Sequence, residues 1–364
     1  MGKIAIHQIM PGFLYGDALG NQAAYIRALL REWGYKSQVY AQFRDNRIAD
    51  PGLDYIRCAG RPQDILIYHY SIGSPLTDFV RQWPGKLVIY YHNITPAHFF
   101  QDYNPEMAKL LAQGRRELKQ FKNAPLALAA SKYNQQELLE LGYRHVEVVP
   151  YFIYFDELLK SADSPAGREI VERYAGDGWV NILFVGRIVP NKRQDDLIRA
   201  FDYYHHQVNA RSRLLLVGSD ANAPGYRVEL EMIASVLGLD EVHLTGPVGL
   251  KEGLGGYFRA ADVFLCLSEH EGFCVPLLEA MRFDVPVIAY RATGVPYTMG
   301  NAGILIAQKR YDVIGELIDL LVNDPHLRHQ VITQQRRRLN DFAPEITAKI
   351  LQTQIKNMIA LFEQ

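Results

Sequence analysis

Two carboxylates lie on either side of a predicted helix start in the second half of the chain. Glu271 and Glu279 both fall in the stretch 268–281, which follows the apolar, strand-like run 261–267. Pro276 lies near the first helical turn, where its missing N–H costs nothing and its fixed φ suits a helix. The pattern therefore predicts a strand, a loop and a helix start, with a carboxylate near each end.

The backbone of this helix start is suited to an anion. The N–H groups of Phe273, Cys274 and Val275 would have no acceptor within the helix, and such groups at a helix N-terminus bind phosphate. The two glutamates would repel a phosphate and are better suited to accept hydrogen bonds from hydroxyls. A phosphate between two groups of hydroxyls describes a nucleotide sugar.

A second set of charged residues follows an earlier predicted strand. The strand 181–186 ends at Gly186, and Arg187 and Lys192 lie on the loop after it. Arginine offers a planar fork for phosphate and lysine a mobile point charge, so the pair could neutralise a diphosphate. No Asp-x-Asp pattern occurs in the chain, so we expect no divalent ion to hold that diphosphate and predict no metal site.

Short apolar runs alternate with helical patterns along the whole chain, which is typical of α/β units on a parallel sheet. Strands are predicted at 4–9, 37–40, 65–68, 87–91, 126–130, 146–149, 181–186, 214–217, 242–245, 263–267, 287–290 and 303–306. Helices are predicted at 22–32, 76–82, 105–121 and 134–140, with three further helical patterns between 326 and 364.

The strands form two series, which predicts two doubly wound parallel-sheet domains with a cleft at the carboxyl ends of both sheets. The segment 151–180 separates the series and has turn signals at Asp163-Ser164-Pro165 and Gly176-Asp177-Gly178, so we interpret it as the crossover between domains. The predicted domains are 1–155 with a returning helix at 345–364, and 156–344.

Composition limits the possible functions. A length of 364 residues favours two domains, and a net charge of -1 argues against binding nucleic acid through bulk electrostatics. No apolar run approaches the roughly 20 residues of a membrane-spanning helix, and no secretory signal is recognised. The three cysteines form no C-x-x-C pair, which fits a reducing cytosol.

The two charged motifs together resemble the family 4 glycosyltransferases of the GT-B fold. They read Gly186-Arg187-x4-Lys192 and Ser268-x2-Glu271-Gly272-Phe273-x2-Pro276-x2-Glu279-Ala280-Met281. The resemblance covers the second domain and is looser in the first. It implies two Rossmann-like domains that face a central cleft, with the acceptor bound by the first and the nucleotide-sugar donor by the second.

The resemblance also implies roles for individual residues of the second domain. Arg187 and Lys192, with Gly186, would bind the donor diphosphate, and Glu271 would accept hydrogen bonds from the transferred sugar. Glu279 would bind the ribose diol. The remaining donor contacts would come from Gly272, Phe273, Cys274 and Val275 at the phosphate, and from Thr245, Pro247 and Val248 at the base.

In the first domain, two loops that follow predicted strands are candidates for the same site. Gly16 and Asp17 lie in the glycine-containing loop 12–21, and glycines allow close backbone approach to a ligand. His92 follows the strand 87–91, and the resemblance places it beside the transferred sugar as a catalytic residue with Glu271, Arg187 and Lys192. His69, His98 and His270 are interpreted as structural or peripheral.

The function that the resemblance implies is retaining transfer of a hexose from a UDP- or GDP-linked sugar to a glycan or lipid-linked saccharide. Bacterial surface polysaccharide or glycoconjugate synthesis in the cytoplasm is the expected setting, with the nucleotide sugar as co-substrate and no cofactor. The leaving phosphate would take the acceptor proton. A nucleotide-sugar epimerase of the same fold and a non-catalytic glycan- or nucleotide-sugar-binding protein remain alternatives.

Some features depart from the pattern or stay open. Cys274 and Asp284 stand where the family often has glycine, and we expect Cys274 to be tolerated with a negative φ. The loop 294–297 lacks the acidic residue of many members. The basic residues of 110–122 (Arg115, Arg116, Lys119 and Lys122) form either a peripheral contact with anionic membrane or a solvated helix face.

Overall fold

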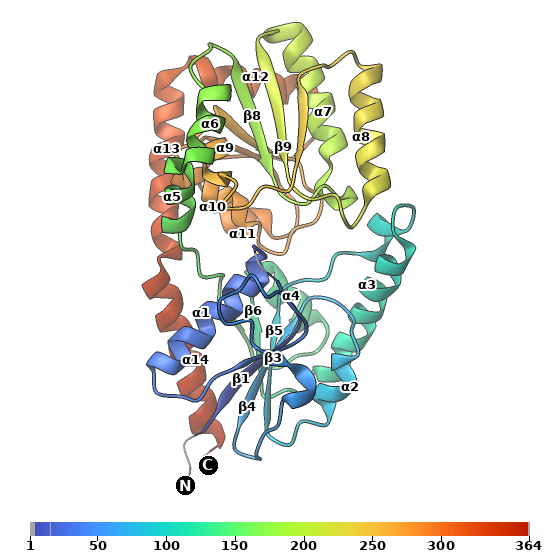
Figure 1. Ribbon diagram of the computed structural model, residues 1–364, viewed down its shortest axis with the longest axis vertical. Helices are drawn as coiled ribbons and strands as arrows, with labels where there is room; N and C mark the ends of the chain where they lie inside the picture. Colours follow the sequence, from blue (N-terminus) through green and yellow to red (C-terminus); the bar gives the residue numbers. More distant parts are fainter. Residues whose placement is uncertain (1–3, 15, 363–364) are drawn as a thin grey trace. The chain divides into compact units, whose positions relative to one another are not determined.

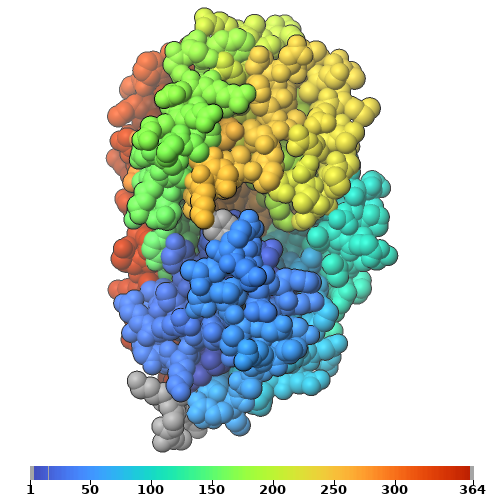
Figure 2. All heavy atoms as spheres, viewed as in Figure 1, coloured from blue at the N-terminus to red at the C-terminus, as the bar shows by residue number. Residues whose placement is uncertain are grey.

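The computed structural model describes residues 4–14 and 16–362, and these form two compact units. The first unit comprises residues up to 97, 108–153 and 342 onward, and the second comprises 98–107 and 154–341. Figure 1 shows helices on both sides of the strands in each unit. Side chains fill the spaces between these ribbons in the space-filling view (Figure 2).

The first unit contains a seven-stranded sheet in which every pairing is parallel, in the order β3-β2-β1-β4-β5-β6-β7. Its strands are β1 (Ile6–Phe13), β2 (Val39–Arg44), β3 (Leu53–Asp54), β4 (Ile65–Tyr70), β5 (Lys86–Tyr91), β6 (Leu126–Ala129) and β7 (Val146–Val148). Its α-helices are α1 (Ala18–Glu32), α2 (Leu76–Arg81), α4 (Lys132–Glu140), α14 (Pro344–Phe362) and, from residue 108 on, α3 (Pro105–Leu118).

The second unit contains a six-stranded parallel sheet in the order β10-β9-β8-β11-β12-β13. Its strands are β8 (Val180–Val185), β9 (Ser212–Val217), β10 (Val242–Gly246), β11 (Val263–Cys266), β12 (Val287–Tyr290) and β13 (Ile304–Ile306). Its α-helices are α5 (Asp156–Asp163), α6 (Pro165–Tyr174), α7 (Gln194–Tyr203), α8 (Pro224–Val236), α9 (Leu254–Ala260), α10 (Val275–Arg282), α11 (Val295–Met299), α12 (Tyr311–Asn323) and α13 (Pro325–Leu339).

Burial explains why the strands appear as continuous apolar runs in the sequence. All six residues of β4 are buried, as expected for a parallel strand covered by helices on both faces. Helix α1 instead buries one stripe, with Ala23, Ile26 and Leu30 against the sheet. The predicted fold class, two doubly wound α/β domains, is confirmed.

Several predicted element boundaries are wrong. The strand predicted at 37–40 is β2, Val39–Arg44, and its start is set by pairing of Val39 with Gln8 of β1. Between 325 and 362 the described chain forms two α-helices joined by a short 3-10 turn at Asn340–Phe342, where three helices were predicted. These boundaries depend on pairing and packing partners that are distant in the sequence.

The segment interpreted as a crossover contains two helices. The signal at Asp163-Ser164-Pro165 is a helix start and not a simple turn. Ser164 is the N-cap of α6, and its hydroxyl accepts a hydrogen bond from the Gly167 N–H at 3.0 Å. Pro165 then occupies the first turn, where its missing N–H is tolerated.

Candidate functional site

The sheet of the second unit brings the two charged motifs together. β8 and β11 are neighbours, with Val263 paired to Ile182 and Phe264 to Leu183. After β8 the chain continues to β9 on one side, and after β11 it continues to β12 on the other side. The loops therefore diverge at the carboxyl ends of β8 and β11, which is where open α/β sheets bind ligands.

Lys192 and Glu271 form an ion pair at this position. Lys192 Nζ donates to Glu271 Oε2 at 2.5 Å, and the two side chains are only 15% and 7% exposed. Each charge compensates the other in a site largely removed from water, so loss of one partner would leave a costly buried charge. Lys192 was predicted to bind the diphosphate of the donor and Glu271 its sugar, and no contact between the two side chains was predicted.

Backbone contacts fix the two loops to each other. The Asn191 side chain donates to the His270 carbonyl at 2.9 Å, and the Asn191 carbonyl accepts from the Glu269 N–H at 2.9 Å. The Glu271 N–H in turn donates to Thr293 Oγ1 at 2.8 Å. These contacts therefore hold the two loops in the positions from which the Lys192 and Glu271 side chains meet.

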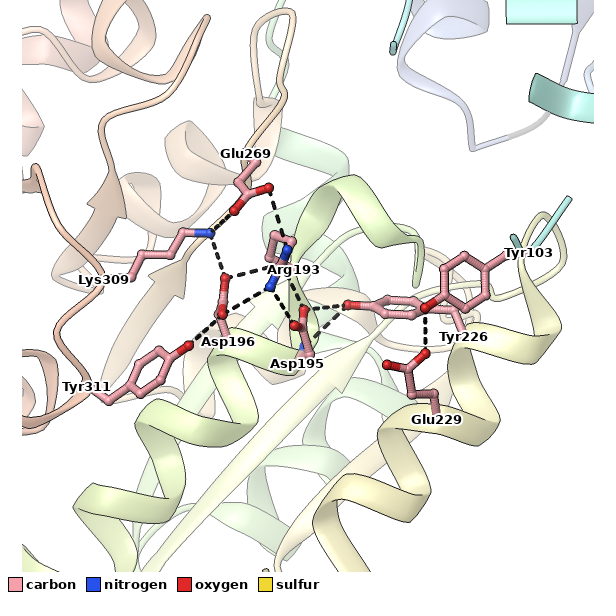
Figure 3. Close-up of polar contacts among 9 residues, drawn as sticks. All are labelled: Tyr103, Arg193, Asp195, Asp196, Tyr226, Glu229, Glu269, Lys309 and Tyr311. Atoms are coloured by element: carbon pink, nitrogen blue, oxygen red, sulfur yellow. Dashed lines mark hydrogen bonds and ion pairs between the residues drawn. The ribbon is translucent and has the colours of Figure 1, made fainter. Parts of the chain in front are cut away.

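A network of ion pairs surrounds the start of α7, directly after Lys192 (Figure 3). Arg193 pairs with Asp195 at 2.7 Å, Asp196 at 3.2 Å and Glu269 at 3.6 Å. Lys309 pairs with Asp196 at 2.6 Å and with Glu269 at 2.8 Å. Because Glu269 belongs to the loop after β11, the network connects that loop to the loop that carries Lys192.

Asp196 is the most buried member of this network. Burial by itself would raise the pKa of Asp196, but hydrogen bonds from Lys309 and from Tyr311, the latter at 2.7 Å, hold this pKa below its ordinary value. Sequence reasoning missed the network. The signal was the Asp195-Asp196 pair in the first turn of a helix, where carboxylates are favourable.

The expectation about the Cys274 backbone is wrong. Cys274 has φ 73° and lies in the left-handed region, where an L-residue is strained. Cys274 is the N-cap residue of α10, and Pro276 lies in the first turn as predicted. Two hydrogen bonds hold the loop at this residue: the Phe273 carbonyl accepts from the Thr298 hydroxyl, and the Cys274 carbonyl accepts from the Leu277 N–H at 3.3 Å.

The start of α10 offers backbone donors. Among the described residues, no acceptor contacts the N–H groups of Cys274 and Val275. Gly294 packs against Gly272, and a Cβ added to Gly294 would lie only 2.5 Å from the Gly272 carbonyl oxygen. Phe273 is buried and anchors the loop. This arrangement is able to hold an anion through backbone hydrogen bonds.

Glu279 lies within α10 and is partly buried. Burial raises its pKa to about 7. No charged group or hydrogen-bond donor from the described residues contacts its carboxylate. A partly accessible carboxylate without a partner is available to accept hydrogen bonds from a ligand's hydroxyls.

Arg187 is exposed on the loop after β8, and its guanidinium has no partner among the described residues. Its backbone is held, since its carbonyl accepts from the Gln194 side chain at 2.9 Å. Gly186 precedes it with φ 156°, a conformation that residues with a side chain rarely adopt. The guanidinium is therefore free to bind an anion.

The residues predicted at the base lie farther along the same edge. Thr245 belongs to β10, the edge strand, which is separated from β8 by β9. Gly246 follows with φ 76°, Pro247 is exposed and Val248 is partly exposed. They share the carboxyl edge with Arg187 but are not in its immediate loop.

In the first unit, Gly16 and Asp17 lie between β1 and α1. Gly16 has φ 75°, Asp17 is the N-cap residue of α1, and both are exposed. β1 and β4 are neighbours at which the strand order reverses, so this loop lies at the equivalent position of the first sheet.

His92 follows β5 and is buried in a chain of hydrogen bonds. Its Nδ1 lies 2.8 Å from the Tyr151 hydroxyl and its Nε2 lies 2.9 Å from Nδ1 of His69. His69 Nε2 lies 2.8 Å from Gln8 Oε1, and the Gln8 amide donates to the Ala23 carbonyl at 3.0 Å.

These hydrogen bonds determine which ring nitrogen of each histidine carries the proton. Because the Gln8 oxygen accepts, His69 carries its proton on Nε2, and His92 then donates from Nε2 to His69 Nδ1. His92 Nδ1 accepts from Tyr151. Burial, followed by the nearby His69, holds the pKa of His92 well below its usual value. Both ring nitrogens are occupied in this structure, so His92 is a neutral side chain without a free donor or acceptor for a substrate.

The basic residues of 110–122, in α3 and the 3-10 turn after it, do not form one uniform exposed face. Arg115 donates to the Ile94 carbonyl at 2.6 Å and pairs with Glu137 at 3.3 Å. Arg116 and Lys119 are exposed and line a pocket of about 380 Å³ with Arg115, Glu137 and Glu140. No helix in the described part of the chain is long and apolar enough to cross a membrane.

The second unit matches a known protein family. Residues 176–338 match the family model described as glycosyl transferases group 1. A D-inositol 3-phosphate glycosyltransferase from Kribbella flavida is 28% identical over 85% of this chain and 72% of that protein. A GDP-mannose-dependent alpha-(1-6)-phosphatidylinositol monomannoside mannosyltransferase from Mycolicibacterium smegmatis is 33% identical, but the match covers 45% of this chain and 44% of that protein.

Solved structures resemble the fold over almost the whole chain. A sucrose-phosphate synthase from Thermosynechococcus elongatus has a TM-score of 0.73 at 18% identity and covers 98% of this chain and 100% of its own. Anabaena HepE, solved with UDP and glucose, has a TM-score of 0.70 at 17% identity and covers 97% of this chain and 99% of its own. At these identities the similarity shows the GT-B fold.

Proposed function

We propose that this chain, which has the GT-B fold and whose residues 176–338 match the glycosyl transferases group 1 model, transfers a hexose from a nucleotide-diphosphate sugar to an acceptor hydroxyl with retention of configuration. The observation that carries the proposal is the position of the Lys192–Glu271 pair. This pair lies where the loops after β8 and β11 diverge, and both of the other donor-type features, Arg187 and the start of α10, belong to the same two loops.

The chemistry requires stabilisation of a leaving diphosphate. The bond between the anomeric carbon and the phosphate oxygen breaks, and its electron pair stays on that oxygen. Lys192, Arg187 and the N–H groups of Cys274 and Val275 would stabilise the developing charge electrostatically. We assign the acceptor proton to the leaving phosphate and therefore name no protein base, in keeping with the neutral and fully hydrogen-bonded state of His92.

Glu271 and Glu279 would bind the two hydroxyl-bearing ends of the donor. Glu271 would accept hydrogen bonds from the sugar while Lys192 keeps it oriented, since an ammonium has three donors and this contact uses one. Glu279, which has no protein partner among the described residues, would accept from the ribose. Glu271, Arg187 and Lys192 need no metal for these roles, and we propose a metal-independent transfer.

The donor and acceptor are proposed by class. The names of the relatives include a GDP-mannose-dependent enzyme, and the HepE structures contain UDP or UDP-glucose, which supports a UDP- or GDP-linked hexose. We propose a glycan or lipid-linked saccharide as the acceptor, in surface polysaccharide or glycoconjugate synthesis. The setting would be the cytoplasm, with Arg116, Lys119 and Lys122 available for contact with anionic lipid.

The test is transfer from radiolabelled UDP and GDP hexoses by the wild type, Glu271→Gln and Lys192→Met. Each substitution should lower kcat by about 10²- to 10³-fold, the usual effect of losing one transition-state contact. The exposed Lys251→Ala is the matched control and should keep full activity. Because Lys192→Met leaves Glu271 unpaired, the double variant Lys192→Met/Glu271→Gln separates loss of stability from loss of chemistry.

The products distinguish the alternatives. Label in an epimerised nucleotide sugar would indicate an epimerase, and donor binding without turnover would indicate a binding protein. Equal transfer by the wild type and Glu271→Gln would overturn the site assignment. An inverted anomeric configuration in the product would overturn the retaining mechanism alone.

A further inference from the structure

Three side chains of metal-ligand type converge beside the proposed donor loop. Cys266 is the last residue of β11, Glu271 lies in the following loop and Cys274 caps α10. Each offers one ligand atom, and the three atoms lie within 4.8 Å of one another. Neither thiol has a part in the proposed transfer, and neither is in a disulfide.

The distances fit a small thiophilic cation. With Zn–S bonds of about 2.3 Å and Zn–O bonds of about 2.1 Å in tetrahedral geometry, ligand atoms are about 3.5–3.8 Å apart. Atoms already within 4.8 Å need to approach by about 1 Å, which side-chain rotation can supply. Two thiolates and one carboxylate leave the fourth position open for water or another oxygen. Thiolate ligands select zinc-like ions over magnesium or calcium.

The local charges balance in both states. Without metal, the two neutral thiols accompany the Lys192–Glu271 pair, whose charges cancel. When a divalent cation binds, the two thiols release their protons to solvent. Two thiolates and one carboxylate then contribute three negative charges, and the cation with Lys192 contributes three positive charges. A site that is neutral with and without the ion avoids the large cost of an isolated buried charge.

The two cysteines differ in burial. Cys266 is fully buried, and its thiol donates to the Ser268 hydroxyl at 3.4 Å, which holds the sulfur beside the loop. Cys274 is less buried than Cys266, so an ion would enter from the Cys274 side. A metal site needs such an entry path and partners that orient its ligands, and here Ser268 orients Cys266 and Lys192 orients Glu271.

We propose that Cys266, Cys274 and Glu271 form a binding site for a thiophilic divalent cation such as Zn²⁺, and that occupancy of this site inhibits sugar transfer. The inhibitory part rests on the proposed function, since the ion takes the carboxylate that would bind the sugar. Ligation of Cys274 also restrains the start of α10, where the donor phosphate would bind. The ion therefore competes with the donor and is not a cofactor of the reaction.

Binding is tested by titration of Co²⁺, followed by Zn²⁺, into the full chain under a phosphine reductant. A thiolate-to-cobalt absorption band should develop at about one equivalent and disappear when Zn²⁺ replaces Co²⁺. Cys266→Ala should abolish the band and weaken Zn²⁺ by more than about 100-fold, since even an outer-shell change costs 10–100-fold. Cys58→Ala, which removes a buried thiol of the first unit, is the control and should leave the band unchanged.

Cys274→Ala is a second variant that keeps the test decisive where Cys266→Ala fails to fold. Absence of a thiolate band in the wild type, or an unchanged band in either cluster variant, overturns the site. Inhibition is tested separately: Zn²⁺ should raise the apparent KM for the donor in the wild type, a chelator should reverse this, and Cys266→Ala should resist it.

The two readouts separate the two ideas. Zn²⁺ binding with unchanged transfer kinetics overturns the inhibitory role. Complete absence of transfer from every donor contradicts the proposed function, while the cobalt spectrum still decides whether the metal site exists.

Discussion

Glu271 and Glu279 carry the same functional group in different environments. Glu271 lies 2.5 Å from the Lys192 ammonium in an almost fully buried ion pair. Glu279 has no charged partner among the described residues, and burial raises its pKa to about 7. The same helix start therefore presents one carboxylate that is held by a counter-charge and one that titrates near neutrality.

The raised pKa of Glu279 predicts a pH dependence of stability. The folded pKa of about 7 lies above the unfolded value of about 4.3, so between these values the unfolded chain loses its proton first. The Glu279 contribution to stability is therefore fully present at low pH and declines as pH rises to about 7, by at most about 4 kcal/mol. In Glu279→Gln, this decline of the free energy of unfolding with rising pH should be absent.

Urea unfolding is measured at about pH 5.0 and about pH 7.5, which together span most of the range between the two pKa values. The readout is the difference in free energy of unfolding between the wild type and Glu279→Gln, compared at the two pH values. Glu169→Gln, which removes an exposed carboxylate of α6, is the control and should change nothing between the two pH values. An equal difference at both pH values would show that Glu279 is ionised in the folded protein throughout this range.

At the scale of elements, the start of α10 combines a strained residue with free backbone donors. Cys274 has φ 73°, and Pro276 follows in the first turn. The loop 267–274 is held from several directions, by Asn191, by Thr293 and by Thr298. These contacts compensate for the strain and fix the direction of the N–H groups that would bind phosphate.

The strain at Cys274 is measurable by comparing Cys274→Ala with Cys274→Gly. Both remove the thiol, but only glycine adopts a positive φ without cost, so Cys274→Gly should be the more stable by about 1 kcal/mol. Ala280→Gly is the control, because Ala280 lies in the helical part of α10. At this position glycine should be less stable than alanine, the opposite order to that at Cys274. Thermal unfolding of all three variants provides the comparison. An Ala variant at least as stable as the Gly variant would contradict a left-handed Cys274.

At the scale of the whole molecule, each unit has its own parallel sheet with its own point of strand reversal. In the second unit this point is formed by β8 and β11 and is followed by Arg187, Lys192 and Glu271. In the first unit it is formed by β1 and β4 and is followed by the loop with Gly16 and Asp17. All the proposed nucleotide contacts except Gly16 and Asp17 belong to the second unit.

Nucleotide binding should therefore stabilise the second unit more than the first unit. UDP or GDP at about 100 times Kd should raise the free energy of unfolding by about 2.7 kcal/mol in a thermal-shift assay. Hydrogen exchange should slow mainly in 186–193 and 268–279. The matching nucleoside, which lacks phosphates, is the control and should give little protection there. Protection confined to the first unit would refute this assignment of the donor site.

The sequence by itself determined the local pattern of this protein. Buried parallel strands appear as apolar runs, and the order of strand, loop and helix around Glu271 follows from these runs together with Pro276. Because loops after parallel strands share one edge of the sheet, Arg187 and Glu271 could also be placed on a common edge. The acidic start of α7 was visible as Asp195-Asp196, but its partners were not.

Only the tertiary structure decided which of these residues touch. Lys192 and Glu271 are separated by 79 positions, and their contact depends on the adjacency of β8 and β11. The φ of Cys274 depends on how its loop is held by Thr293 and Thr298, and the engagement of both His92 nitrogens depends on His69 and Tyr151. Periodicity reports which face of an element is buried, but the partner across a loop is set by packing of distant segments, and so it becomes visible only in the folded chain.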